Sequence, residues 1–423
     1  MHKIERLLQT LAPKGVEFKT LEEVFEIKNG YTPSKNNPEF WKNGTIPWFR
    51  MEDIRENGRI LKDSIQHITP KALKGKKLFP KNSIIISTTA TIGEHALLIV
   101  DSLANQRFTF LSKKANCDSV LDMKFFFYQC FLLGEWCKKN TNVSGFASVD
   151  MTAFKKYKFP IPPLEIQQEI VKILDAFTEL NTELNTELKA RKKQYEYYQN
   201  MLLDFNDINQ SHKDAKEKLA QKTYPKRLQT LLQTLAPKGV EFRKLGEVCD
   251  FQKGKSITKK AVTFGKVPVI SGGRQPAYYH NEANRSGETI AISSSGVYAG
   301  YVSYWDIPVF LADSFSVSPK QKTLMPKYLF HYLTTQQDAI HATKSAGGIP
   351  HVYSKDLQNF LIPIPPLEIQ QEIVKILDQF SLLTTDLLAG IPAEIKARKK
   401  QYEYYREKLL TFKPLNPNKE VKK

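Results

Sequence analysis

The chain has 423 residues, enough for two to four ordinary domains, and its 41% hydrophobic and 11% aromatic content excludes global disorder. Lysine and arginine outnumber aspartate and glutamate by 62 to 44, and the net charge of +18 favours a polyanionic partner such as nucleic acid. The N-terminus lacks an apolar signal core and no apolar stretch reaches membrane-spanning length, so we expect a soluble cytoplasmic protein without a membrane partner.

The cysteines indicate neither a metal site nor a disulfide framework. Cys117, Cys130, Cys137 and Cys249 contain no CxxC pair, and no histidine stands at ligand spacing from them. We therefore expect no zinc site, and thiols that stay reduced as in a cytoplasm.

The sequence contains an internal repeat, and such a repeat indicates that the two halves of the chain share one structural plan. LLQTLAPKGVEF at 7–18 recurs at 231–242, PIPPLEIQQEIVKILD at 160–175 recurs at 363–378, and KARKKQYEYY at 189–198 recurs at 396–405. Between these blocks the sequence has diverged, retaining Gly30 with Gly254, NSIIIS at 82–87 with ETIAIS at 288–293, and ungapped segments that start at Gly145 and Gly348. Recent duplication of the helical blocks explains their identity but not the divergence. The contrast predicts that the helices have the same function in both copies, whereas the two globular parts have different functions.

The repeat also predicts the order of the domains. We expect a globular domain over 1–160, a central long helix over 161–205, a linker over 206–228, a second globular domain over 229–363, a C-terminal long helix over 364–412 and a tail over 413–423.

After each Pro-Pro pair, apolar residues fall three and four apart, the pattern of an amphipathic helix that packs on a partner. In the first copy they are Ile166, Ile170, Ile173, Phe177, Leu180, Leu184, Leu188, Tyr195, Tyr198 and Leu202. In the second they are Ile369, Ile373, Ile376, Phe380, Leu383, Leu387, Ile391, Ile395, Tyr402, Tyr405 and Leu409, with one extra four-residue step. A stripe of roughly 40 residues predicts a helix of about 60 Å.

Three prolines mark the ends of these helices. Pro163 and Pro366 stand just before them, where a missing N–H costs little, whereas Pro392 is expected to kink or break the second helix after about Leu388. The first helix also contains TELNTELNTEL at 178–188, a tetrapeptide written nearly three times, where the second copy reads SLLTTDLLAGIPAEI.

These elements predict the fold class. It is α+β, with two globular domains of mixed β-sheet and helices separated by two long antiparallel helices that form a coiled-coil stalk, in a pseudo-two-fold internal repeat.

The globular segments resemble a known family. GYTPSKNNPEFWKNGTIPWFRMEDI at 30–54 resembles the opening of target-recognition domains in the specificity subunits of Type I restriction-modification systems, as do TTATIGEH at 88–95 and LANQRFTF at 103–110. IPPLEIQQEIV supports the resemblance in both copies, which covers nearly the whole chain. The second domain departs from the opening pattern with KGKSITKKAVTFGKVPVISGG at 253–273 but keeps SSSGVYAGY at 293–301 and LADSFSV at 311–317. Because of this departure, the DNA target of the second domain stays open, whereas its assignment as a target-recognition domain does not.

The resemblance implies a division of labour. Each target-recognition domain would read one half of a bipartite, asymmetric site in double-stranded DNA, and the paired helices would set the gap and dock two methyltransferase subunits. Restriction subunits, which translocate and cut DNA, would join them. S-adenosylmethionine, ATP and Mg would belong to these partners, with no cofactor in this chain.

Two fragments of catalytic motifs fail on inspection. Gly254-Lys255-Ser256 ends like a P-loop, but Cys249 stands where the first glycine is required. Asn37-Pro38-Glu39-Phe40 mimics an amino-methyltransferase motif, but Glu39 replaces its second proline, and no Gly-rich loop follows a strand to hold S-adenosylmethionine. We predict no catalytic and no metal site, hence a non-catalytic recognition subunit.

Two other classes of function compete with this reading. A coiled-coil adaptor whose head domains bind proteins would explain the helices and the repeat, but neither the charge nor the resemblance. A complete nuclease or methyltransferase would need the motifs that are missing.

Candidate DNA contacts are the side chains that read base edges or hold phosphates, in loops rich in Arg, Lys, Asn and Gln. In the first domain they are Ser34, Lys35, Asn36, Asn37, Trp41, Arg50 and Arg55. In the second they are Lys255, Ser256, Lys259, Lys260, Arg274, Gln275, Tyr278, Tyr279 and Arg285. Trp41, Trp48 and Trp305 are expected to be core residues more than stacking ones, and Lys74, Lys76, Lys77, Lys113 and Lys114 are either phosphate contacts or solvated charge.

A repeated basic cluster on the helices is a candidate for gripping spacer phosphates or a methyltransferase subunit. Its members are Arg191, Lys192, Lys193 and Tyr195, repeated as Arg398, Lys399, Lys400 and Tyr402.

Overall fold

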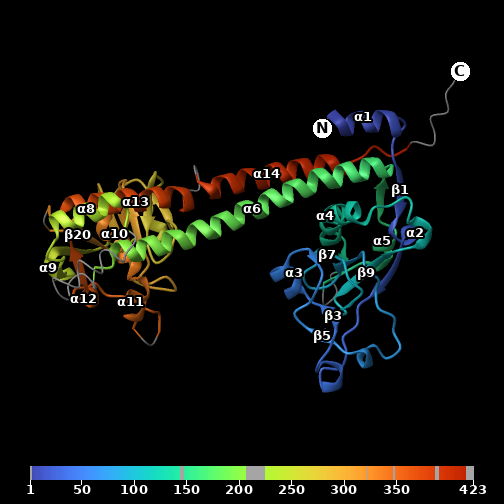
Figure 1. Ribbon diagram of the computed structural model, residues 1–423, viewed down its shortest axis with the longest axis horizontal. Coiled ribbons are helices and arrows are strands. Elements are labelled where there is room, and N and C mark those ends of the chain that lie inside the picture. Colours follow the sequence, from blue (N-terminus) through green and yellow to red (C-terminus); the bar gives the residue numbers. More distant parts are fainter. Residues whose placement is uncertain are drawn as a thin grey trace. The chain divides into compact units, whose positions relative to one another are not determined.

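The computed structural model describes residues 2–142, 147–205, 224–320, 322–345, 348–385 and 390–415. The chain divides into two compact units, one of Met1–Glu183 with Lys396–Lys423 and the other of Leu184–Ile395 (Figure 1). Each unit combines a globular stretch from one half of the sequence with portions of both long helices. Gly145, Leu387, Leu388 and most of the expected linker lie outside the described residues.

The first unit is built on two sheets. The larger has the order β2-β9-β6-β7-β4, antiparallel except for β4, which runs parallel to β7; the smaller has the order β5-β3-β8. The strands are β2 (Phe25–Asn29), β3 (Ile46–Phe49), β4 (Ile60–Leu61), β5 (His67–Ile68), β6 (Ser83–Ser87), β7 (His95–Leu98), β8 (Leu103–Ala104) and β9 (Phe108–Lys113). Every residue of β6 and β7 is buried, as expected for the continuous apolar run SIIIS in a covered sheet.

Helices and short strands complete the first unit. Helix α4 (Met123–Lys139) packs against β6 and β7 (Figure 1), and β1 (Glu17–Thr20) pairs with β12 (Lys158–Ile161), the strand that leads into the long helix. The remaining elements are α1 (His2–Leu11), α2 (Leu21–Val24), η1 (Pro38–Phe40), α3 (Met51–Asn57), η2 (Pro70–Leu73), η3 (Ala115–Cys117), β10 (Thr141–Asn142), β11 (Ser148–Val149) and α5 (Met151–Lys155).

The second unit repeats this plan. Its sheets have the orders β14-β20-β17-β18 and β16-β15-β19, which correspond to β2-β9-β6-β7 and β5-β3-β8 of the first unit, with β15 and β19 parallel. The strands are β13 (Glu241–Lys244), β14 (Cys249–Lys253), β15 (Val267–Ile270), β16 (Tyr278–His280), β17 (Thr289–Ser293), β18 (Val302–Trp305), β19 (Phe310–Leu311), β20 (Ser314–Pro319) and β21 (Leu361–Ile364).

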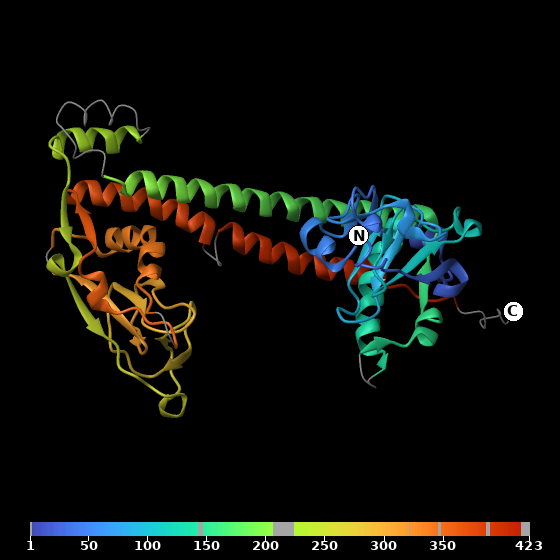
Figure 2. The same cartoon turned by 90° about the horizontal axis from the view of Figure 1, so that it is seen from below.

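The helices of the second unit follow the same order. Helix α10 (Pro326–Thr335), the counterpart of α4, lies between the strands β17 and β18 and the long helix α13 (Figure 2). The others are α8 (Lys226–Leu235), α9 (Leu245–Val248), η5 (Lys259–Ala261), α11 (Gln337–Ala342) and α12 (Ser354–Leu357). The predicted mixed sheets and internal repeat are therefore confirmed.

Gly30 and Gly254 match because both lie against backbone. Gly30 N donates to Phe108 O at 2.8 Å, and a Cβ on Gly30 would lie 2.2 Å from Asn105 O. A Cβ on Gly254 would lie 2.5 Å from Ala312 O. No side chain fits at either position, so the glycine beside Lys255 and Ser256 serves close packing of the backbone.

The long helices are α6 (Leu164–Leu203), α13 (Leu367–Thr385) and α14 (Ile391–Leu410). Phe177 stacks on Tyr405 at 5.7 Å between ring centroids in the first unit, and Tyr198 stacks on Phe380 at 5.1 Å in the second. As the residue number along α6 rises from 177 to 198, the number of the residue it stacks on falls from 405 to 380. The predicted antiparallel pairing of the long helices is therefore confirmed.

The predicted stripe needs two corrections. Leu174 and Leu377, absent from it, are fully buried, whereas Ile173 and Ile376 are half-buried. Ile166, Ile170 and Leu174 are four residues apart and belong to the core of the first unit, and Ile173 packs at the edge of the same core. Leu383 is 45% exposed and does not continue the stripe.

Pro392 is the second residue of α14, a position where its missing N–H costs little. The described helices on either side are separate elements, α13 ending at Thr385 and α14 beginning at Ile391. The break predicted after about Leu388 falls on residues outside the described ranges.

The four cysteines are free and buried. Burial raises the pKa of the Cys137 and Cys249 thiols to about 12, so both are protonated and inert at neutral pH. Among the described helices, none is long and apolar enough to cross a membrane.

Candidate nucleic-acid interface

Four loops of the first unit converge at one end of its sheets because strand pairing aligns their anchors. Gly30, which follows β2, donates its N–H to Phe108 O, and Phe108 pairs with Ser87 at the end of β6. Asn105 N donates to Phe49 O at 3.1 Å, at the end of β3. The loops after β2, β3 and β6 and before β9 therefore form one surface.

A basic pocket opens on this surface. It has a volume of about 320 Å³, and the side chains of Lys35, Arg50, Arg55 and Arg107 line it together with one carboxylate, Glu52. The other lining residues are Thr32, Trp48, Met51, Ser87, Thr91, Asn105, Gln106 and Phe108. Several cations around hydroxyl and amide groups suit a polyanion that also presents hydrogen-bonding edges, as duplex DNA does.

The first domain's predicted contacts fall into two groups. Lys35, Arg50 and Arg55 line the pocket, whereas Ser34, Asn36, Asn37 and Trp41 do not. Asn37 Oδ1 accepts from Glu39 N at 3.1 Å, and Trp41 Nε1 donates to Ser34 O at 2.9 Å, so these residues shape the loop that carries Lys35.

Arg107 and Gln106 line the pocket but were absent from the predicted contacts. LANQRFTF supported the family resemblance, but the sequence does not show that Arg107 lies near Arg50. The pairing of β8 with β3, together with the bond from Asn105 N to Phe49 O, places the two residues in one pocket. Lys74 and Lys76 lie over the rings of Phe40 and Tyr31, at 5.3 and 3.9 Å from the ring centroids.

The second unit places four equivalent loops together. Gly254 N donates to Ser314 O at 2.8 Å, Ser314 pairs with Ser293 at the end of β17, and Ala312 N donates to Ile270 O at the end of β15. Among the predicted contacts, Lys255 and Ser256 follow β14, and Arg274 and Gln275 follow β15, so all four belong to this surface.

Aromatic rings hold Arg274 on this surface. Its guanidinium lies 5.0 Å from the ring of Tyr298 and 5.6 Å from that of Tyr301, and Tyr298 is 41% exposed. Such stacking limits the side chain to few rotamers and leaves its N–H donors available at the surface.

The remaining predicted contacts of the second domain differ in accessibility. Lys259 and Lys260 are exposed on η5, Tyr279 is 55% exposed, and Tyr278 is half-buried beside it on β16. Arg285 bonds internally: its guanidinium donates to Ser316 Oγ at 2.9 Å and to the carbonyls of residues 252, 253 and 284. Burial lowers the pKa of Arg285. These bonds occupy the guanidinium of Arg285 within the unit and give it a structural role.

Trp48 is a core residue, as predicted, whereas Trp41 and Trp305 are only partly buried. Trp48 is 2% exposed and meets Trp41 edge to face at 5.0 Å. Trp41 and Trp305 are half-buried, and Trp305 Nε1 donates to Ser303 Oγ at 2.9 Å.

A duplicated glutamine attaches each long helix to its globular part. Gln167 is fully buried; its Nε2 donates to Val120 O and Pro162 O at 2.8 and 2.6 Å, and its Oε1 accepts from Asp122 N at 2.8 Å. Gln370 makes the same three bonds, to the backbone of residues 323, 365 and 325, at 2.7–2.9 Å. Sequence reasoning missed both, although their place in the repeated IPPLEIQQEIV was a signal.

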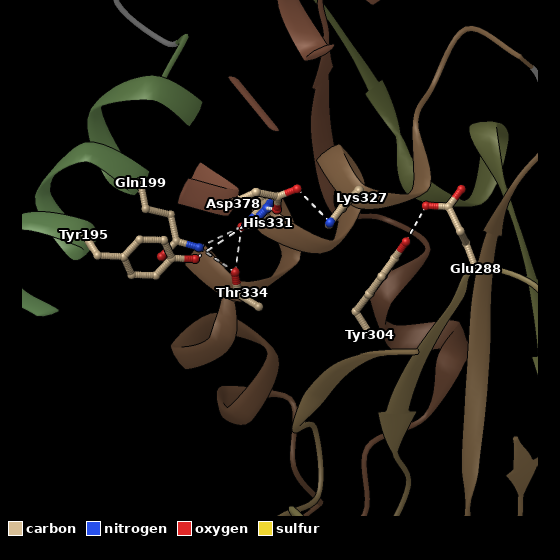
Figure 3. Close-up of polar contacts among 8 residues, drawn as sticks. All are labelled: Tyr195, Gln199, Glu288, Tyr304, Lys327, His331, Thr334 and Asp378. Carbon is tan, nitrogen blue, oxygen red and sulfur yellow. Dashed lines mark hydrogen bonds and ion pairs between the residues drawn. The ribbon is translucent and has the colours of Figure 1, made fainter. Parts of the chain in front are cut away.

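A duplicated aspartate forms a second attachment. In the first unit Asp175 accepts from Lys124 Nζ and from the Tyr128 hydroxyl, each at 2.6 Å. In the second unit Asp378 pairs with Lys327 Nζ at 2.6 Å and with His331 Nε2 at 3.1 Å (Figure 3).

Helix α6 reaches the same histidine from its other side. Gln199 Nε2 donates to His331 O at 3.1 Å and to Thr334 Oγ1 at 2.6 Å, and the Tyr195 hydroxyl lies 3.5 Å from His331 Nδ1 (Figure 3). Burial raises the pKa of Tyr195 to about 12. Helices α6, α10 and α13 are thus held together by side chains around one buried imidazole.

The repeated basic cluster splits by burial. Lys192, Lys193, Lys399 and Lys400 are exposed. Arg191 and Arg398 are half-buried, and each donates from Nη1 to the glutamine three residues on, at 3.2 Å. Tyr195 and Tyr402 are half-buried within their own units. The repeat also carries Tyr197 and Tyr404, 59% and 60% exposed, which the predicted set omitted.

Across the described ranges, no group of three or more His, Cys, Asp or Glu side chains is placed to hold a metal ion.

Comparisons with known proteins match these features. A family model for the Type I restriction modification DNA specificity domain matches residues 13–193 and again 237–397. The type I restriction enzyme EcoprrI specificity subunit of Escherichia coli is 41% identical over 402 residues, which cover 92% of this chain and 93% of that protein. The EcoR124I/EcoR124II specificity subunit of Escherichia coli is 32% identical over 308 residues, 64% of this chain and 69% of that protein. The solved S subunit of a Type-I restriction-modification system from M. genitalium has a TM-score of 0.57 at 19% identity, covering 93% of this chain and 95% of that one, and so shares the fold.

Proposed function

Because the chain belongs to the Type I restriction-modification DNA specificity subunits, which recognise DNA and are not catalytic, we propose that its two loop surfaces read the two halves of one bipartite DNA site. The first surface carries Lys35, Arg50, Arg55 and Arg107; the second carries Lys255, Ser256, Arg274 and Gln275. The domains that present them are residues 1–160 and 229–363.

One observation carries this proposal: the two surfaces have the same backbone scaffold and different side chains. Equivalent strands end at equivalent loops, yet the first pocket gathers four cations and the second surface a cation held on tyrosine rings. The scaffold supports a common task, and the difference in side chains supports different target sequences.

We further propose that the paired long helices set the gap and that two methyltransferase subunits dock on them. The exposed lysines 192, 193, 399 and 400 and the exposed Tyr197 and Tyr404 recur identically, which suits a partner that binds twice in one way. Restriction subunits would join this complex in the cytoplasm. S-adenosylmethionine, ATP and Mg would be held by these partners.

The test is a domain exchange in the native complex. Replacing residues 229–363 by the equivalent domain of a relative should change one half of the methylated motif and leave the other half unchanged, as read by modification-aware genome sequencing. A change in both halves, or a single continuous motif, would contradict independent readers.

A protein-binding adaptor remains the contrasting class, and salt dependence distinguishes it. Titration of the full chain with random duplex DNA at two salt concentrations should show affinity that falls steeply as salt rises, because bound phosphates release counterions. An adaptor would show no such binding.

A further inference from the structure

Arg107 and Asp313 occupy the same place in the two repeats. Each directly precedes its central strand, β9 or β20. The carbonyl of Arg107 accepts from Thr88 N at 3.1 Å, and the carbonyl of Asp313 accepts from Ser294 N at 3.1 Å. Since the ladders β6–β9 and β17–β20 have the same register at this end, the two side chains start from equivalent backbone positions with opposite charge.

A second pair of equivalent positions differs in the same sense. Arg50 directly follows β3 and Ser271 directly follows β15, and each of these strands ends beside a parallel partner, β8 or β19. The first unit therefore presents guanidinium donors at two positions where the second presents a hydroxyl and a carboxylate.

The surroundings of each residue match its charge. Arg107 is exposed and lines the pocket with Arg50 and Arg55. Asp313 is half-buried, and its Oδ2 accepts from the Ser295 hydroxyl, a contact that orients the carboxylate within the loop.

An aspartate on a DNA-reading surface weakens binding, because its carboxylate and the DNA phosphates repel each other. Its presence there is explained if the carboxylate binds a hydrogen-bond donor on a base. Among base edges of the major groove, the cytosine N4 amino group pairs with aspartate or glutamate, whereas guanine offers the two acceptors O6 and N7 that arginine binds. Arg107 therefore suits a guanine, and Asp313 suits a cytosine.

We propose that Arg107 reads a guanine in the first half-site and that Asp313 reads the amino group of a cytosine in the second. This assignment rests on the proposed function and adds to it the chemistry of one base in each half-site. Arg107 and Asp313 are specificity-determining residues at one structural position.

The test uses the full-length chain in its native complex, with the methylated motif read by modification-aware genome sequencing. Asp313→Asn keeps the shape and the acceptor for Ser295 but prefers adenine. It should shift one cytosine of the second half-site towards adenine by roughly 5- to 150-fold, with the first half-site unchanged. Asp313→Glu should retain the cytosine. Arg107→Ala should relax one guanine of the first half-site only.

Matched controls remove the same charge elsewhere. The control for Asp313→Asn is Asp306→Asn. Asp306 lies at the opposite end of β17, next to Trp305, which pairs with Thr289. Lys81→Ala lies just before the opposite end of β6. Both should leave the motif unchanged.

Several outcomes would overturn the proposal. An unchanged motif in Asp313→Asn would do so, as would loss of all methylation in both Asp313 variants, which would show a structural role. Equal weakening on every sequence in Arg107→Ala would make that residue a phosphate contact. If the unaltered complex methylates no bipartite motif, the proposed function itself fails, so the two failures are distinguishable.

Discussion

His331 Nε2 lies 3.1 Å from Oδ1 of Asp378, at the position where the Tyr128 hydroxyl bonds to Asp175 in the other repeat. The two attachments share an aspartate on the long helix and a lysine one turn before the His or Tyr. The second repeat thus holds its helix through an imidazole where the first uses a phenol.

We predict that Asp378 stabilises the fold at neutral pH and not in acid. Burial alone would raise the pKa of Asp378, but the bonds from His331 and Lys327 outweigh it, so the pKa lies below its ordinary value of 3.8. A carboxyl whose pKa falls on folding stabilises the folded state above its unfolded pKa, and this stability is lost as pH falls through the folded value. Asp378→Asn should lower the free energy of unfolding at neutral pH by about 1–3 kcal/mol.

The measurement is urea unfolding of the full chain at neutral pH and at about pH 3, where the difference between the variant and the parent should be smaller. The reason is that the unfolded chain takes up a proton at Asp378 at a higher pH than the folded chain does. Asp306→Asn, an exposed aspartate of the same unit, is the control and should change little. An equal loss at both pH values would contradict the carboxylate's role.

The buried glutamines should be sensitive to truncation. Gln167→Ala leaves Asp122 N and two carbonyls without their partner inside the protein, at about 1–3 kcal/mol for each group left unsatisfied. Gln168→Ala, the exposed neighbour, is the matched control and should be near neutral. Thermal unfolding of the three proteins checks this, and equal melting temperatures would refute it.

Proline in the interior of either long helix should abolish assembly. Ile173→Pro or Ile376→Pro removes a backbone bond and clashes with the preceding turn, at about 3 kcal/mol or more. Ile173→Ala and Ile376→Ala keep the helix and serve as controls. Size-exclusion light scattering of the complex gives the result, and an unchanged mass for the proline variants would rule the prediction out.

The tetrapeptide repeat in α6 should act as a ruler for the gap. Leu180, Leu184 and Leu188 are each half-buried and recur every four residues. One added TELN unit lengthens a helix by about 6 Å and turns its far end by roughly 400°, a net 40°. One base pair rises about 3.4 Å and turns DNA by about 35°, so the rotations agree.

Inserting or deleting one unit should therefore keep both half-sites and change the gap by one base pair. The methylated motifs of the variants give the answer. A gap that stays the same, or half-sites that change, would show that this repeat sets no distance.

The sequence by itself determined the class of the protein and its plan. Identical blocks flanking diverged stretches predicted like helices and unlike readers, and apolar residues three and four apart predicted the helices themselves. Both signals are local or repetitive, because helix periodicity is set by neighbours along the chain and a repeat is visible by comparison of the chain with itself. The mixed sheets and the antiparallel helices followed those predictions.

Only the tertiary structure decided which side chains share a surface. Lys35, Arg50 and Arg107 line one pocket because the ends of β2 and β3 lie beside the start of β9. Arg285 bonds inward, to Ser316 and to backbone carbonyls. The roles of Gln167 and Gln370 likewise depend on backbone about 45 residues away. These contacts depend on strand pairing between distant segments, which no local sequence pattern encodes. The residue types in the sequence therefore predicted the chemistry of the site, but not which residues form it.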